Sequence, residues 1–292
     1  MNVLDLKSIS LFKGDKCVLN NLNLNIHKKE ICCLLGRNGA GKSSLFKTIF
    51  GIYKPQSGVI YLNGVEVSPK NRDQYLNKVG ALIEGAALYE HLTGYENLDF
   101  VRRYFTGEKS RIIELLDLVG LMPDKDKKTK YYSSGMKQRL GLAMALFHKP
   151  SLVILDEPTN ALDPEGISEF RSLVKRLNKV EGVSFLISTH QLEEAGYYKD
   201  HILILKEGKL VFDNALQDIQ ALRILPHQTY PHVAEELQDQ CYWREDEAFT
   251  LLKAPLTEFP LLWDELNAPS LEDIYLAIHQ QKSHATHELL SY

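Results

Sequence analysis

A glycine-rich segment early in the chain has the spacing of a phosphate-binding loop. Residues Gly36–Ser43 read G-R-N-G-A-G-K-S and match the pattern G-x-x-x-x-G-K-[ST] between an apolar run and a helical pattern. Glycines at these positions let backbone N–H groups turn inward around phosphate oxygens, and the helix start adds partial positive charge. We expect Lys42 to reach the β- and γ-phosphates and the Ser43 hydroxyl to ligate Mg²⁺. A glycine-rich turn without a ligand is the alternative, but motif and context agree on phosphate.

A pair of carboxylates supplies the second half of the predicted site. Asp156 and Glu157 directly follow the apolar run Leu152–Leu155, which reads as a buried strand. We expect Asp156 to hold the Mg²⁺ shell and Glu157 to polarise a water molecule for in-line attack on the γ-phosphate. Such a pair can instead serve only as a helix cap, but a phosphate loop needs an acidic partner of this kind.

Two further segments belong to the same prediction. His190 follows the predicted strand Ser184–Ile187, at the strand edge where α/β sheets bind ligands, although a lone histidine is usually structural. Residues Tyr132–Arg139 precede the apolar helix Leu140–Phe147. This second helix start can bind an anion, with Ser133 as its cap and as a phosphate ligand.

The elements that position these residues alternate between strands and helices. Val3–Leu11 and Val18–Ile26 alternate apolar and polar residues and predict two half-buried strands, whereas Ile31–Leu35 predicts a strand buried on both faces. The other predicted elements are a turn at Phe12–Asp15, a helix over Ser43–Phe50, a hairpin at Gly58–Gly64, mainly helical segments between Tyr95 and Phe147, and a helix over Glu165–Asn178. This order predicts an α/β fold with a mainly parallel sheet.

Together the motifs resemble the nucleotide-binding subunit of ABC transporters, over about residues 2–212. Gly36–Ser43 matches Walker A, Leu152–Glu157 matches Walker B, and Ser133–Arg139 stands where the family has its LSGGQ signature. Asn160–Asp163 looks like the D-loop and His190 like the switch histidine. The resemblance implies an α/β fold with a P-loop NTPase core of ABC ATPase type, and hydrolysis of ATP with Mg²⁺.

The resemblance also implies a set of site residues. Glu157 and His190 are the implied catalytic residues, and Ser43, Glu84 and Asp156 are the implied metal ligands. Phe12 matches the aromatic residue that stacks on adenine. The residues implied to contact ATP are Phe12, Gly36, Arg37, Asn38, Gly39, Ala40, Gly41, Lys42, Ser43, Ser44, Ser133, Gly135 and Asp163.

Two departures from the family pattern point to one branch of it. The signature has Tyr132, Ser134 and Met136 at its first, third and fifth places, and Glu84 stands where most members have the Q-loop glutamine. This glutamate, with a G-M-K-Q-R-L signature, resembles the bacterial branch that includes bacitracin and lantibiotic immunity transporters and phenol-soluble-modulin exporters. Whether Glu84 ligates metal or acts only in coupling stays open.

The chain divides into two predicted domains. Residues 1–212 form the ATPase domain, with a β-subdomain and a helical subdomain at about residues 85–150. Beyond about Asp213 the chain is acidic and proline-containing and holds both tryptophans, so residues 213–292 predict a small C-terminal accessory domain. Its apolar anchors form either its own core or a dimer contact. The anchors are Trp243, Phe249, Leu261, Leu262 and Trp263.

Composition limits the partners and the location. With 292 residues, 44% hydrophobic residues and a net charge of −4, the chain is an ordinary globular protein without the basic field that binds nucleic acid. No apolar run reaches the roughly 20 residues of a membrane span, so we expect a soluble chain. The resemblance implies work at the cytoplasmic face of the plasma membrane, with a separate permease subunit and a second ATPase chain as homodimer or paralogous heterodimer.

The implied function is to power export of a peptide or other amphipathic molecule. Within transport, the rival cargoes are sodium, a lipid or a small drug. A different class is a soluble ABC ATPase of DNA repair or translation. Those proteins usually carry long coiled-coil insertions or two cassettes in one chain, and this sequence has neither.

Overall fold

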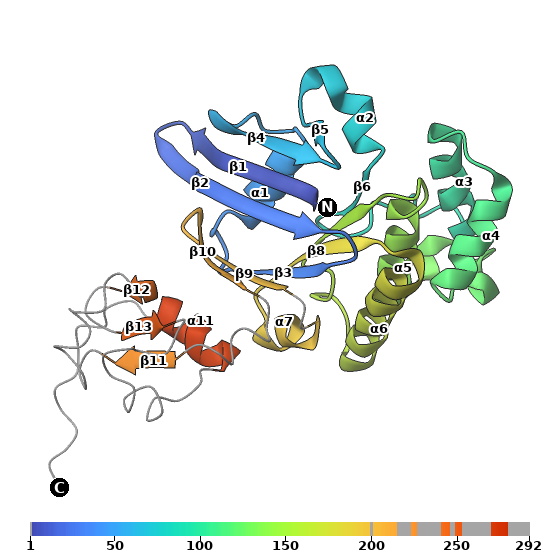
Figure 1. Cartoon of the computed structure of the whole chain (residues 1–292). Helices are drawn as coiled ribbons and strands as arrows, with labels where there is room; N and C mark the ends of the chain where they lie inside the picture. The colour runs from blue at the N-terminus through green and yellow to red at the C-terminus, as the bar shows by residue number, and fades with distance from the viewer. Residues whose placement is uncertain are drawn as a thin grey trace, which may run out of the picture. The chain divides into compact units, whose positions relative to one another are not determined.

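The chain divides into two compact units, Met1–Asp213 and Asn214–Tyr292 (Figure 1). The computed structural model describes residues 2–198, 201–214, 223–226, 241–245, 249–252 and 270–279. Each unit is described by itself below.

A six-stranded sheet forms the centre of the first unit, with strand order β10-β9-β3-β8-β7-β6. Its strands are β3 Ile31–Leu35, β6 Val79–Leu82, β7 Leu152–Asp156, β8 Ser184–Thr189, β9 His201–Lys206 and β10 Lys209–Asn214. Strand β3 lies between β8 and β9 and is parallel to both. All five of its residues are buried, which confirms the predicted strand covered on both faces.

A second, four-stranded sheet has the order β2-β1-β4-β5 and is antiparallel. Its strands are β1 Asn2–Lys13, β2 Lys16–His27, β4 Ser57–Leu62 and β5 Val65–Glu66. The turn predicted over Phe12–Asp15 is too long. Phe12 pairs with Cys17 and Lys13 with Lys16, so the ladder continues until only Gly14 and Asp15 remain for the turn.

One hydrophobic core joins the two sheets through helix α1 (Lys42–Ile49). Leu45 and Phe46 of α1 are fully buried with Leu24 of β2 and Leu34 of β3 in this core. Burial of these side chains away from water is favourable, and it holds α1 in one position relative to both sheets. The amino end of α1 is thereby placed as well. Helix α7 (Leu192–Tyr198) packs against β3, and α5 (Ser134–Ala145) packs against β6.

Three helices pack together to one side of the parallel sheet (Figure 1). They are α3 Gly94–Tyr104, α4 Lys109–Leu118 and α5. Helix α6 (Pro164–Glu181) packs against α5 and against α7. The shorter helices are α2 Arg72–Leu76 and the 3₁₀ turns Pro69–Asn71, Met122–Asp124 and Thr129–Tyr131. In the part of the chain that the structure describes, no helix has the length and apolarity to cross a membrane.

The second unit contains a small antiparallel sheet of order β11-β13-β12 and one described helix. The elements are β11 Arg223–Pro226, β12 Cys241–Glu245, β13 Phe249–Leu252 and α11 Leu271–His279. Trp243 lies in β12 and Phe249 in β13, whereas the predicted anchors Leu261, Leu262 and Trp263 lie outside the described residues. The dimer role of this unit stays a prediction.

Candidate active site

The glycine-rich loop follows β3 at the carboxyl edge of the parallel sheet. Gly41 is the N-cap residue of α1 and has a φ of 114°, a conformation that L side chains rarely adopt. At Gly36 a Cβ atom would lie 2.8 Å from the carbonyl oxygen of Leu205 in β9. The backbone path therefore requires glycine at both ends of the predicted phosphate loop.

Lys42 is buried where the loop meets α1. Its Nζ donates a 2.6 Å hydrogen bond to the Gly36 carbonyl oxygen and lies 3.1 Å from Oε1 of Glu157. These contacts place the ammonium group inside a pocket of about 190 Å³. The pocket lining consists of Val18, Arg37, Asn38, Gly39, Gly41, Lys42, Ser43, Ser44 and Glu157. Val18, from β2, was not predicted from the sequence.

Asp156 ends β7 beside the phosphate loop. The Ser43 hydroxyl donates to Asp156 Oδ2 at 3.4 Å, and the Ser188 hydroxyl donates to Asp156 Oδ1 at 2.5 Å. Ser188 also accepts from the backbone N–H of Glu157 at 3.0 Å. Ser188 therefore orients both carboxylate residues from the neighbouring strand β8, a role that sequence reasoning missed.

Glu157 lies at the centre of the site. Its carboxylate accepts from Lys42 and Asn160 and lies 3.1 Å from Nδ1 of His190. Burial opposes ionisation, but the Asn160 hydrogen bond, the Lys42 hydrogen bond and charge, and the nearby His190 outweigh it, so the pKa of Glu157 lies below its ordinary value. Its φ of 46° is left-handed, which a non-glycine residue keeps only where its surroundings enforce it.

His190 follows β8 and approaches the same carboxylate. Its side chain is 45% exposed, so the ring has room to contact a ligand beyond Glu157. The structure thus brings together the phosphate loop, Asp156, Glu157 and His190. Each comes from the carboxyl end of a parallel strand, as the sequence predicts.

Glu84 follows β6 and pairs with a lysine of α1. Its Oε1 lies 3.4 Å from Lys47 Nζ, and its side chain is mostly exposed. Its φ of 56° again lies in the left-handed region. Lys47 is four residues beyond Ser43 on the same helix. The metal role of Glu84 stays a prediction.

Phe12 lies at the exposed end of β1, next to a contact that the sequence did not predict. Its backbone N–H donates to Gln56 Oε1 at 2.8 Å, and its side chain is 43% exposed. The neighbouring Lys13 donates to the Ser44 hydroxyl at 3.2 Å, and its Nζ lies 4.5 Å from the centre of the Tyr53 ring. Lys13 and Tyr53 therefore extend the site beyond Ser44.

The signature residues lie outside the pocket lining. Ser133 is the N-cap of α5 and accepts from the Met136 backbone N–H at 3.2 Å, which confirms the predicted cap. Gly135 follows in the first turn of the same helix. Asp163 caps α6 by accepting from the Gly166 N–H at 2.8 Å. Within one chain these residues serve helix starts and not the phosphate loop.

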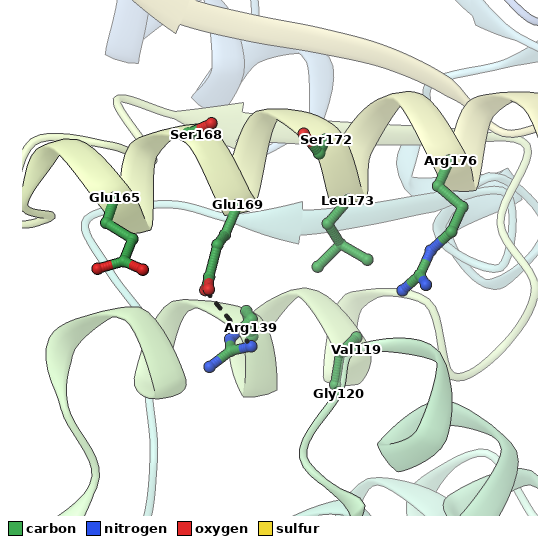
Figure 2. A pocket seen from close by; sticks show the side chains of 9 residues that line it. All are labelled: Val119, Gly120, Arg139, Glu165, Ser168, Glu169, Ser172, Leu173 and Arg176. Atoms are coloured by element: carbon green, nitrogen blue, oxygen red, sulfur yellow. Dashed lines mark ion pairs between the residues drawn. The ribbon is translucent and has the colours of Figure 1, made fainter.

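A second pocket, of about 440 Å³, lies between α5 and α6 (Figure 2). Arg139, the last residue of the signature segment, reaches across it to Glu169 of α6, with 3.7 Å between Nη1 and Oε2. Arg176 of α6 donates to the Leu118 carbonyl oxygen at the end of α4. These two contacts connect α6 to the signature helix and to the end of α4, respectively.

Comparison with known proteins decides the family. Residues 19–160 match the family described as ABC transporter. The lantibiotic transport ATP-binding protein SrtF of Streptococcus pyogenes is 39% identical over 211 residues, which cover 72% of this chain and 90% of SrtF. The chain belongs to the ABC transporter family. The bacitracin transport ATP-binding protein BcrA of Enterococcus faecalis is 41% identical over 210 residues, covering 72% of this ABC ATPase and 68% of BcrA.

Solved structures agree with this assignment. CbiO1 from Clostridium perfringens, part of the ABC transporter complex cbiONQ, has a TM-score of 0.70 and 27% identity and covers 82% of this chain and 95% of that chain. The post-hydrolysis dimer of the cassette MJ0796, bound to ADP and Pi, has a TM-score of 0.64 and 26% identity and covers 73% and 98%. With SrtF and BcrA among its relatives, this ABC protein is an ATP-binding subunit of the bacitracin and lantibiotic branch and an ATPase.

One relative extends the likeness into the second unit. An ABC transporter ATP-binding protein of Nostoc sp. (strain PCC 7120), all4389, is 33% identical over 297 residues, which cover 93% of this chain and 86% of that protein. SrtF, in contrast, matches over 72% of this chain although the match takes up 90% of SrtF. The second unit is thus shared with some relatives and not with others.

Proposed function

We propose that this ATPase works as a dimer and powers export of a peptide or other amphipathic molecule through a separate membrane permease. The observation that carries the proposal is the position of Glu157 between Lys42 and His190, at 3.1 Å from each. This arrangement suits hydrolysis of a bound γ-phosphate. The cargo class rests on the relatives SrtF and BcrA, whose names give lantibiotic and bacitracin transport.

The phosphates of ATP bind in the loop pocket. Lys42 then exchanges its contact with Glu157 for phosphate oxygens, and this frees one carboxylate oxygen. The lowered pKa of Glu157 keeps the group ionised near neutral pH, so it can accept a hydrogen bond from the attacking water. His190 holds the other carboxylate oxygen and orients the water toward the γ-phosphate.

The donor set beside the phosphate loop fits Mg²⁺. Ser43 Oγ and Asp156 Oδ2 are hard oxygen donors 3.4 Å apart, and oxygen atoms are the ligands that Mg²⁺ prefers. Ser43 would bind the ion directly and Asp156 would hold its water shell, with Ser188 fixing the carboxylate. When bound, Mg²⁺ neutralises phosphate charge. Glu84 would approach the same region after release from Lys47.

A second ATPase chain completes the site. Ser133 and Gly135 begin helix α5, where backbone N–H groups can bind an anion, but they do not line the pocket of their own chain. We infer that they contact the γ-phosphate bound by the partner chain. The dimeric structure of the related cassette MJ0796 supports this arrangement. Phe12 and Asp163 contact the nucleotide from the first chain and the partner, respectively.

Transport by the complete complex tests this proposal. The ATPase would be purified with its permease, reconstituted into vesicles with the ATPase outside, and supplied with ATP and labelled bacitracin or a lantibiotic. We expect the peptide to accumulate inside vesicles with the unmodified chain and not with Glu157→Gln. The vesicles could instead hydrolyse ATP and take up sodium, a lipid or a drug, but no peptide. That result would show that the cargo is not a peptide.

A further inference from the structure

A cluster of three metal-binding side chains lies at the amino edge of the parallel sheet. Glu30 directly precedes β3, Cys32 is its second residue, and His201 is the first residue of β9. Cys32 and His201 are register partners in the parallel pairing of these strands. One ligand atom from each of the three residues lies within 4.8 Å of the other two.

The distances suit a tetrahedral ion. Cys32 Sγ lies 3.6 Å from His201 Nδ1, and Glu30 Oε1 lies 2.8 Å from the same nitrogen. A zinc ion with bonds of about 2.3 Å to sulfur and about 2.05 Å to nitrogen and oxygen separates S from N by about 3.6 Å and O from N by about 3.3 Å. Cys32 Sγ already lies at the required distance from His201 Nδ1, whereas Glu30 Oε1 needs to move about 0.5 Å away from that nitrogen.

Asp213 orients the histidine for this role. It accepts a hydrogen bond from His201 Nε2, on the side of the ring away from Glu30 and Cys32. Without an ion, Nδ1 donates to Glu30 Oε1; when a metal displaces that proton, the lone pair of Nδ1 faces the thiol and the Glu30 carboxylate while Nε2 keeps its bond to Asp213. Metal-binding histidines commonly donate their second N–H to a carboxylate in this way.

The donor types and the burial favour zinc over magnesium or calcium. We propose that Glu30, Cys32 and His201 bind one Zn²⁺, with water as the fourth ligand. A thiolate, an imidazole and a carboxylate match the preferences of this ion, whereas Mg²⁺ and Ca²⁺ take oxygen donors. Cys32 is fully buried, while the side chains of Glu30 and His201 are 17% and 14% exposed, so an ion can enter from the Glu30 side.

This site is separate from the nucleotide. Glu30 precedes β3 and Gly36 follows it, so the strand holds the two sites roughly 20 Å apart. The ion would join β3 to β9, and through Asp213 also to β10. The competing possibility is a polar network of Glu30, His201 and Asp213 that binds no metal.

Cobalt and zinc titrations of the full-length chain distinguish the two. The protein would be stripped with a chelator and titrated with Co²⁺ and then with Zn²⁺, without nucleotide. We expect one equivalent of Co²⁺ to give a sulfur-to-metal charge-transfer band and tetrahedral d–d bands, both abolished by Zn²⁺. We also expect Zn²⁺ to raise the melting temperature. Absence of stoichiometric binding at micromolar metal, or binding without the sulfur band, would overturn the proposal.

The adjacent cysteine supplies a matched control. Cys32→Ala should lose the charge-transfer band, whereas Cys33→Ala, equally buried on the same strand but outside the cluster, should keep it. Asp213→Asn changes a more exposed residue and should weaken Zn²⁺ binding by roughly 10- to 100-fold. If Cys32→Ala does not fold, the Zn²⁺ affinity of Asp213→Asn decides whether the site exists. Unchanged Zn²⁺ affinity in a folded Cys32→Ala or Asp213→Asn protein would contradict the site.

Discussion

Lys42 and Glu157 form an ion pair that joins the phosphate loop to the end of β7, with 3.1 Å between Nζ and Oε1. Their side chains are only 6% and 20% exposed, so the pair is shielded from water. The pair places the cation expected to bind phosphate against the carboxylate expected to polarise water. In the proposed mechanism, ATP binding redistributes this contact before hydrolysis.

The position of Ser133 predicts that the signature acts on the ATP of the partner chain. Ser133→Arg alone should abolish hydrolysis although its own phosphate loop is intact, because the arginine blocks the partner's γ-phosphate. Mixing a Lys42→Ala chain with a Ser133→Arg chain should restore activity, since each mixed dimer keeps one intact site. The ATPase rate of each protein and of the mixture measures this. Normal hydrolysis by the homogeneous Ser133→Arg protein would contradict the composite site.

The position of Glu84 beside Lys47 predicts that substitutions of Glu84 affect transport more than they affect nucleotide binding. Glu84→Ala should lower transport more than ATP affinity, because the residue lies where the sheet joins the helical region. Glu84→Gln should be milder, since the amide keeps the hydrogen-bonding shape. ATP affinity and peptide uptake, measured on the same reconstituted complex, give the comparison. An equal loss of affinity and transport in both variants would indicate a simple metal ligand.

Glu194 of α7 predicts a dependence of stability on pH. The residue is fully buried, and Thr159 donates its hydroxyl proton to the carboxylate, with Oγ1 3.1 Å from each oxygen. Burial raises the pKa of Glu194 above its ordinary value of 4.5, despite hydrogen bonds from Thr189 and Thr159 and the charge of Arg171. The folded state therefore keeps a proton that the unfolded state releases, and stability falls as the pH rises from 4.5 toward the raised pKa.

Glu194→Gln should remove this dependence. Relative to the variant, the unmodified chain should lose up to about 1.4 kcal/mol of unfolding free energy per pH unit across that window. Urea unfolding of both proteins at several pH values above 4.5 provides the measurement. Parallel stability curves for the two proteins would show that Glu194 titrates normally.

The second unit predicts a role in association and not in nucleotide binding. Truncation after Asp213 should leave ATP binding intact, because all phosphate-loop residues precede it and SrtF has little chain beyond the matched region. If the predicted anchors Trp243 and Phe249 contact a partner chain, truncation should weaken nucleotide-free association. Sedimentation of both forms without ATP tests this. Identical association would leave these residues only a role in the core of their own unit.

Local motifs made much of the fold and the site predictable. Gly36–Ser43 is contiguous, and buried strands such as Ile31–Leu35 and Leu152–Leu155 are unbroken apolar runs, so one window of sequence contains the signal. Ser188 could not be found in this way. Its hydrogen bond to Asp156 spans 32 residues and arises only from the parallel register of β7 and β8.

The same reason explains other residues that the sequence analysis did not identify. Lys13 reaches Ser44 only because β1 passes beside α1. Val18 lines the pocket only because β2 also passes beside α1. The long β1–β2 ladder also carried Phe12 into a strand where turn residues predicted a loop. Such contacts depend on packing between elements and not on residue spacing.

Single-turnover and steady-state hydrolysis by Glu157→Gln test the central claim most directly. The amide keeps the size of the side chain but cannot accept a proton from the attacking water. We predict unchanged ATP affinity, hydrolysis slower by at least about 100-fold, and a trapped ATP-bound dimer on gel filtration. Asn160→Ala, which removes one hydrogen bond to Glu157 but keeps the carboxylate, serves as the control and should retain measurable turnover. Near-normal hydrolysis by Glu157→Gln would contradict the account.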